Sequence, residues 1–200
     1  MRTLVLLPGF MCDNDLWRDM VPELGQLGQL HYGNDYQDDT LEGMARRILA
    51  EAPEQFVLIG FSMGGFVARV LTLMAPQRVA GVAFIASSAR EYTEAERERD
   101  PVLLERLRDM QRRLGPEVRI RQSALIRKDG YADLERITCP SLVVACRQDR
   151  LRSFGQTERM AKHLPNTRFE VIENCGHMAP LEKPHELTAL LGDWISRAGL

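Results

Sequence analysis

The sequence lacks a surplus of charge of either sign and has no long apolar run. Its 200 residues include 26 Lys and Arg and 28 Asp and Glu, which gives a formal net charge of −2. This balance provides neither the basic field that attracts nucleic acid nor a polybasic membrane anchor, so we expect neither partner. No apolar stretch approaches the roughly 20 residues that span a bilayer.

Cysteine is also scarce, and it follows no recognisable pattern. The four cysteines are Cys12, Cys139, Cys146 and Cys175. They form no C-x-x-C pair and match no zinc spacing, so we interpret them as reduced structural residues. At the N-terminus, the apolar stretch Leu4–Leu7 ends at Pro8, too early for the h-region of a signal peptide. We therefore expect a cytoplasmic protein with one domain over residues 1–200.

Short apolar runs alternate with longer helical patterns along the chain. This alternation predicts an α/β fold with a parallel sheet and helices on both of its faces. Several of the runs are continuously apolar, as expected for strands that are buried on both sides. Six strands are predicted: Thr3–Leu7, Gln29–Tyr32, Phe56–Gly60, Val79–Ala86, Ser141–Cys146 and Arg168–Glu173.

Three helices are clear, two of them between these strands and one after the last strand. An apolar stripe with helical spacing runs from Leu41 to Ala52, behind Thr40 as a candidate N-cap. A second helix begins at Ser62 and ends before Pro76, because proline disfavours helix in the preceding residue. The last helix begins at Pro184, since proline is well tolerated at the first helical position.

The segment 89–140 interrupts the alternation. It contains no convincing strand, and Arg90–Arg119 holds eight basic and eight acidic residues. Apolar residues recur at helical spacing within it, so we predict a helical lid insertion of two or three helices. Its charges are mainly those expected of a solvated face. The alternative is that arginines of the lid bind an anionic substrate.

A G-x-S-x-G motif, Gly60–Gly64, lies between a predicted buried strand and a predicted helix. This is the strand–turn–helix context of a nucleophile elbow, in which a sharp turn exposes the serine hydroxyl above the sheet. Ser62 is therefore the candidate nucleophile. The alternative is a glycine-rich helix start at which Ser62 is only an N-cap.

A serine nucleophile requires a histidine base and an acid that orients it. His177 follows the last predicted strand and Asp149 follows the strand before it, so both lie where catalytic groups gather in open α/β sheets. Glu91 is the main rival for the acid, and Asp149 could instead pair with a neighbouring arginine. The other histidines, which occupy ordinary structural places, are His31, His163 and His185.

Three motifs, LLPGFMCDNDLW, GFSMGGFVA and CGHMAPLEKP, together resemble the α/β-hydrolase superfamily, in particular its small esterase-like members. The resemblance covers nearly the whole chain and is weakest across the insertion. It implies Ser62 as nucleophile, His177 as base and Asp149 as acid. It also implies an oxyanion hole from the backbone N–H groups of Phe10 and Met63, and no metal or other cofactor.

The chain departs from the family pattern in three places. Pro8 stands where the family usually has histidine, and Cys146 stands near the start of the acid loop where glycine is usual. The sheet is also expected to lack the usual N-terminal antiparallel strands, because the chain begins directly at the family's third strand. The backbone donor of Phe10 survives these changes.

The expected function is hydrolysis of a small carboxylic ester or thioester through an acyl-enzyme. The same triad also serves C–C bond hydrolases, lyases and acyltransferases, and a non-catalytic binding module is a further alternative. Apolar side chains flank the predicted site, which favours an apolar acyl group as substrate, although core packing would also explain them. The predicted substrate-binding residues are Phe10, Met11 and Met178. Because the lid is small, we expect an open site.

Overall fold

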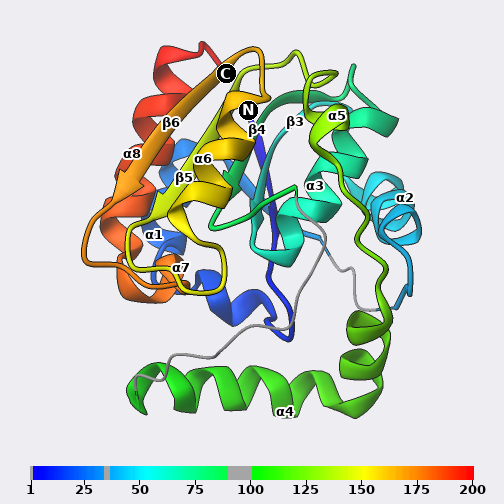
Figure 1. The fold of residues 1–200 in the computed structure, drawn as a ribbon, viewed down its shortest axis with the longest axis vertical. Helices are drawn as coiled ribbons and strands as arrows, with labels where there is room; N and C mark the ends of the chain where they lie inside the picture. The colour runs from blue at the N-terminus through cyan, green and yellow to red at the C-terminus, as the bar shows by residue number, and fades with distance from the viewer. Residues whose placement is uncertain (1, 34–36, 90–100) are drawn as a thin grey trace.

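The structure is a computed structural model that describes residues 2–33, 37–89 and 101–200 (Figure 1). Its six strands form one sheet with the order β2-β1-β3-β4-β5-β6, and every neighbouring pair is parallel. Each strand matches its predicted range to within one residue, which confirms the predicted α/β architecture. The strands are β1 (Thr3–Leu7), β2 (Gln29–Tyr32), β3 (Phe56–Phe61), β4 (Val79–Ile85), β5 (Ser141–Cys146) and β6 (Thr167–Ile172).

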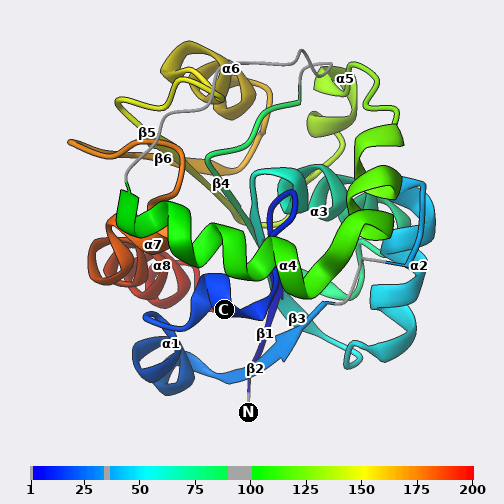
Figure 2. The same cartoon turned by 90° about the horizontal axis from the view of Figure 1, so that it is seen from below.

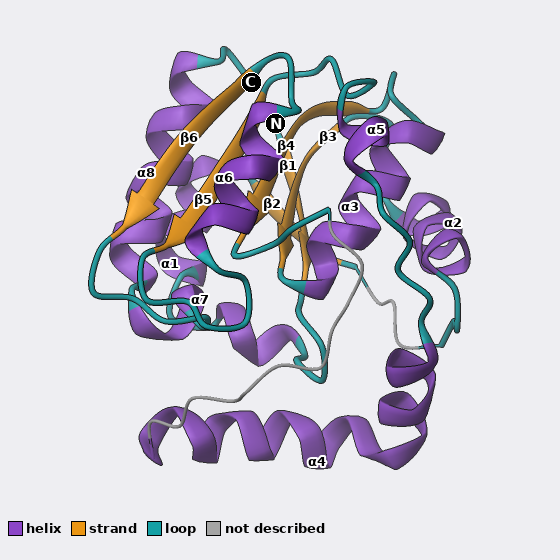
Figure 3. Ribbon diagram, in the orientation of Figure 1, coloured by secondary structure: helices purple, strands orange, loops and turns teal. Residues whose placement is uncertain are grey.

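Helices cover both faces of this sheet (Figure 3). The predicted cap of the second α-helix is present, since Thr40 Oγ1 accepts a hydrogen bond from the Gly43 N–H at 3.1 Å. The helices of the described residues are η1 (Asn14–Trp17), α1 (Val21–Leu27), α2 (Leu41–Glu51), α3 (Met63–Met74), α4 (Pro101–Ala124), α5 (Tyr131–Leu134), α6 (Phe154–Lys162), α7 (Ala179–Glu182) and α8 (Pro184–Arg197).

The central strands are buried on both faces, and alternate residues of β1 belong to two different core clusters. Leu4 and Leu6 pack with apolar residues of η1, α1 and α8. Val5 and Leu7 pack with α2, α3 and α6 on the opposite face. Because side chains of a strand point alternately to the two faces, a continuous apolar run builds both layers at once.

Among the described residues between β4 and β5 there are two helices, α4 and α5, and no strand. Helix α4 crosses the molecule beyond the carboxyl ends of the strands (Figure 2). It is interrupted at Gly115, whose φ of 77° and ψ of 175° are not helical, directly before Pro116. Met110, before the break, is fully buried in the cluster shared with α1 and α8. Glu91, the alternative candidate for the orienting acid, lies outside the described residues.

Helix α4 is long, but it is rich in charged residues. No helix in the described ranges combines the length and the apolar character that crossing a membrane requires.

Candidate active site

The G-x-S-x-G motif forms a sharp turn between β3 and α3. Ser62 has φ 50° and ψ −109°, a conformation that is strained for any residue with a side chain. This strain explains why α3 begins at Met63 and not at Ser62 as predicted. The Ser62 N–H donates to the Ile85 carbonyl oxygen at 2.9 Å, and Ser87 Oγ donates to the Ser62 carbonyl oxygen at 2.9 Å. The turn is therefore held from the neighbouring strand β4 and the loop after it.

Two glycines of the motif leave room that a side chain would fill. A Cβ atom on Gly60 would lie 2.6 Å from the carbonyl oxygen of Gly64. A Cβ atom on Gly64 would overlap the carbonyl oxygen of Leu7 at the end of β1. Since both obstacles are backbone atoms, the close approach of β1, β3 and α3 requires glycine at these positions.

The structure brings the three predicted triad side chains together. His177 Nε2 lies 2.8 Å from Ser62 Oγ, and His177 Nδ1 lies 2.8 Å from Asp149 Oδ2. The other carboxylate oxygen of Asp149 accepts the N–H groups of Leu151 and Arg152, each at 2.8 Å. The side chain of Asp149 is completely buried, whereas that of His177 is 13% exposed. The acid is thus fixed by its own loop, and the imidazole has access to solvent.

The loop that carries His177 is tied down by two side chains. Glu182 accepts the N–H of Gly176 at 2.7 Å and that of Met178 at 2.8 Å, one with each carboxylate oxygen. Gln148 Oε1 accepts the Cys175 N–H at 2.9 Å, and the Gln148 N–H donates to the Cys175 carbonyl oxygen at 3.0 Å. The acid loop and the histidine loop therefore hold each other in place.

Of the two predicted oxyanion donors, Met63 directly follows Ser62 in the chain, and Phe10 belongs to the loop after β1. Met63 is the first residue of α3, so its N–H has no acceptor within the helix. The loop after β1 passes close to the serine, because a Cβ atom on Gly9 would lie 3.4 Å from Ser62 Cβ and 2.8 Å from the Phe61 ring. Phe10 is the residue after Gly9 in this loop.

The predicted substrate-binding residues differ in exposure. Phe10 and Met178 are half-buried and pack at the edges of the two core clusters. Met11 is only 2% exposed and has φ 53°. Their contact with a substrate remains a prediction.

The three histidines outside the predicted triad have other surroundings. His31 is in β2, whereas His163 Nδ1 lies 2.9 Å from the Arg159 carbonyl oxygen and His185 Nδ1 lies 2.7 Å from Glu23. The sequence does not predict three residues that support these loops. Glu182 could have been found from its place in CGHMAPLEKP, whereas no sequence signal marks Ser87 or Gln148.

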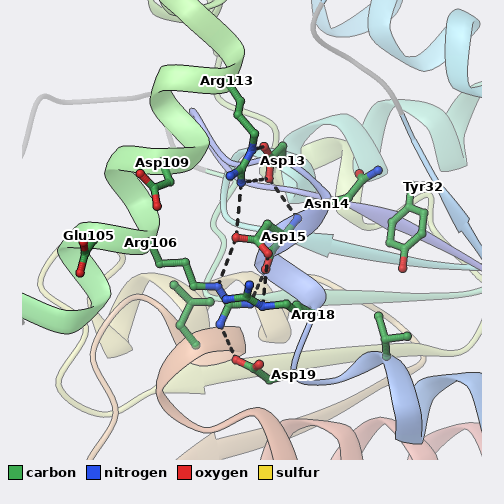
Figure 4. Close-up of a pocket in the computed structure, with 12 residues that line it drawn as sticks. Asp13, Asn14, Asp15, Arg18, Asp19, Tyr32, Glu105, Arg106, Asp109 and Arg113 are labelled. Carbon is green, nitrogen blue, oxygen red and sulfur yellow. Dashed lines mark hydrogen bonds and ion pairs between the residues drawn. The ribbon is translucent and has the colours of Figure 1, made fainter.

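A cavity of about 970 Å³ lies between α4 and the η1 segment, and none of the triad residues lines it (Figure 4). Charged side chains cross it: Arg106 bonds to Asp19, and Arg113 bonds to Asp13 at 2.6 Å. Burial by itself raises the pKa of Asp13, but hydrogen bonds from Arg113 and the Asp15 N–H outweigh it and lower the pKa below its ordinary value. These ion pairs hold α4 against the N-terminal part of the chain.

No cluster within the described ranges could hold a metal ion. The buried thiols of Cys146 and Cys175 interact with each other, and this hydrogen bond together with burial raises the pKa of Cys146 far above its usual value. Burial also raises the pKa of Cys139 to about 11. Cys139 and Cys146 therefore remain protonated thiols at neutral pH, as expected for structural residues.

The sequence is similar to those of known esterases. A pimeloyl-acyl-carrier-protein methyl ester esterase of Nitrosomonas europaea is 25% identical over 242 residues, which covers 93% of this chain and 92% of the relative. The enzyme of the same name from Edwardsiella ictaluri is 41% identical over 95 residues, but this match spans only 44% of the chain and 37% of the relative.

The fold is shared with solved structures as well. A thermophilic esterase from Thermogutta terrifontis superposes with a TM-score of 0.86 at 22% identity, over 99% of this chain and 90% of that one. The family model described as the alpha/beta hydrolase family matches residues 4–190. With its parallel sheet, its serine turn and this match over most of its length, the chain belongs to the alpha/beta hydrolase family.

Proposed function

We propose that this protein hydrolyses small carboxylic esters or thioesters with Ser62 as nucleophile, His177 as base and Asp149 as orienting acid. One observation carries the proposal: the continuous line of hydrogen bonds from Ser62 through His177 to Asp149, with both distances at 2.8 Å. A serine hydroxyl is a weak nucleophile by itself, and a neighbouring base that is itself oriented by an acid activates it.

In the first step, Ser62 Oγ attacks the carbonyl carbon of the ester while its proton passes to His177 Nε2. The carbonyl electron pair moves onto oxygen, and the N–H groups of Phe10 and Met63 stabilise the resulting oxyanion. Donors of this kind contribute about 3–4 kcal/mol each where they have been removed from other enzymes. His177 then gives the proton to the leaving alkoxide or thiolate, which leaves Ser62 acylated.

In the second step, water attacks the acyl-enzyme and gives its proton to His177. The tetrahedral intermediate collapses, the acid product leaves, and the proton returns to Ser62. Asp149 does not take the proton. It holds the imidazole in the tautomer that accepts at Nε2 and stabilises the imidazolium. The partial exposure of His177 supports a role for water from outside the protein.

The substrate class is supported by the names of the relatives, which are esterases acting on a methyl ester of a carrier-bound acyl chain. We infer that this chain also accepts an acyl group with an apolar portion, next to Phe10, Met11 and Met178. C–C bond hydrolysis, elimination and acyl transfer could use the same three residues, but nothing in the described site favours them over hydrolysis.

Labelling with a fluorophosphonate tests the nucleophile. Wild-type protein should react at one serine, Ser62→Ala should not react, and Ser153→Ala, which changes an exposed serine at the start of α6, should react like wild type. Equal labelling of wild type and Ser62→Ala would rule out the nucleophile. A panel of short-chain and medium-chain acyl esters, with a CoA thioester, then defines the substrate.

A further inference from the structure

Gln122, near the end of α4, reaches the loop that carries the proposed oxyanion donor. Its side chain is fully buried, and its Oε1 accepts the backbone N–H of Met11 at 2.8 Å. Its Nε2 is also buried, and it has no hydrogen-bond partner among the described residues. A buried amide whose NH₂ group has no partner is uncommon, so the acceptor bond to Met11 is the contact that explains its presence.

The loop around Met11 needs such an acceptor because of its shape. The Cys12 N–H donates to the Gly9 carbonyl oxygen at 3.1 Å, which closes a tight turn with Phe10 and Met11 at its centre. Met11 has φ 53°, and turns with a positive φ at this position differ from the common type I turn by a flip of the central peptide. For a residue with a side chain the flipped form is strained, so it persists only when its surroundings hold it.

Both sides of the flipped peptide are held. The Met11 N–H donates to Gln122, and the Phe10 carbonyl oxygen accepts a hydrogen bond from Cys12 Sγ at 3.5 Å. The bond to sulfur is the weaker of the two, because a thiol is a poor donor. Gln122 is therefore the main restraint on the peptide between Phe10 and Met11.

Gln122 is in turn connected to the helix of the nucleophile. Arg127 Nη2 donates to the Gln122 carbonyl oxygen at 3.4 Å, and the Arg127 guanidinium lies over the Phe66 ring, 5.6 Å from its centroid. Phe66 is in the first turn of α3, four residues after Ser62. The contacts thus link the oxyanion loop, the end of α4 and the start of α3.

We propose that Gln122 is a positioning residue for the reaction: by accepting the Met11 N–H it holds the Gly9–Cys12 turn in the form that places the Phe10 N–H beside Ser62. The inference rests on the proposed function, since the Phe10 N–H matters only if an oxyanion forms. It predicts that losing the acceptor lowers the rate of the chemical step and leaves substrate binding unchanged.

Three variants test this. Gln122→Met keeps the length of the side chain but removes the acceptor, Gln122→Glu keeps an acceptor and replaces the unpaired NH₂ group with a second carboxyl oxygen, and Gln111→Met makes the same change as Gln122→Met at a half-buried site of the same helix. We expect Gln122→Met to lower kcat by about tenfold to 100-fold with KM within about twofold, because small displacements of a site cost rates of this order. Gln122→Glu should recover most of this loss, and Gln111→Met should match wild type.

The kinetics are to be normalised to the fraction of folded protein, taken from each variant's unfolding curve. A kcat of Gln122→Met equal to wild type after this correction would overturn the inference, as would equal losses in Gln122→Met and Gln122→Glu. A rise in KM with kcat unchanged would also overturn it. If wild-type protein neither labels nor hydrolyses any ester, the proposed function itself fails, which is a separate result.

Discussion

Glu182 holds His177 from both sides, since its two carboxylate oxygens accept the N–H groups of the residues directly before and after the histidine. The carboxylate never touches the imidazole in these contacts. It fixes the backbone from which the imidazole projects, so the 2.8 Å distance from His177 Nε2 to Ser62 Oγ depends on it.

We therefore expect Glu182→Gln to reduce kcat, because the amide nitrogen cannot accept and one of the two N–H groups loses its partner. An unpaired buried donor costs about 1–3 kcal/mol, so the free energy of unfolding should fall by this order. Steady-state kinetics and urea unfolding measure the two effects. Glu186→Gln, at an exposed position of α8, is the matched control, and unchanged kcat in Glu182→Gln would contradict the prediction.

Asp149→Asn tests the acid. The asparagine oxygen can still accept the Leu151 and Arg152 N–H groups, so the loop should keep its shape. Its NH₂ group then faces His177 Nδ1 and favours the wrong tautomer, which lowered kcat about 10⁴-fold in a serine protease. Hydrolysis rates of Asp149→Asn and of Asp39→Asn, an exposed control, give the comparison. A loss below tenfold would point to another acid.

The ion pair between Asp13 and Arg113 makes the attachment of α4 sensitive to pH. The pKa of Asp13 is lowered from its ordinary value of 3.8, so its contribution to stability is present above that value. The contribution is lost as the pH falls through the still lower pKa of the folded state.

Asp13→Asn should thus be less stable than wild type at neutral pH, and the difference should shrink as the pH falls below the ordinary aspartate pKa of 3.8. Urea unfolding at a series of pH values measures it, with Asp109→Asn in the exposed Asp109–Arg112 pair as the control. A difference that does not change with pH would exclude this ion pair as its source.

Gly64→Ala tests the close approach of α3 to β1. Its Cβ atom would overlap the Leu7 carbonyl oxygen, and neither backbone can shift without disturbing the turn of Ser62. We expect a loss of about 1–3 kcal/mol in unfolding free energy, as for overpacked cores, together with reduced activity. Gly155→Ala in α6 meets no atom within 4 Å and should be neutral or stabilising. Urea unfolding of both variants provides the measurement.

Much of this fold could be predicted because its strands are local apolar runs. A buried parallel strand such as Ser141–Cys146 is recognisable without its partners, and its carboxyl end marks where a functional loop follows. The same reasoning led to Asp149 and His177, which do lie within hydrogen-bonding distance of each other.

The parts that could not be predicted depend on contacts between distant segments. Gln122 meets Met11 across 111 positions, and its own helix has no pattern that distinguishes it from other polar residues. Helix α1 is not predicted because it has only seven residues, and its apolar positions, Val21, Leu24 and Leu27, make too short a pattern to identify a helix. The break in α4 follows from the backbone of Gly115, which a side-chain pattern does not reveal.

The sheet being entirely parallel has a practical consequence. The triad loops follow the carboxyl ends of the strands, whereas both ends of the described chain lie on the side of the amino ends (Figure 1). A tag, a fusion partner or a solid support attached at either end would therefore face away from the loops of the proposed triad. Immobilised through either end, the protein would still present Ser62, the proposed nucleophile, to the surrounding solution.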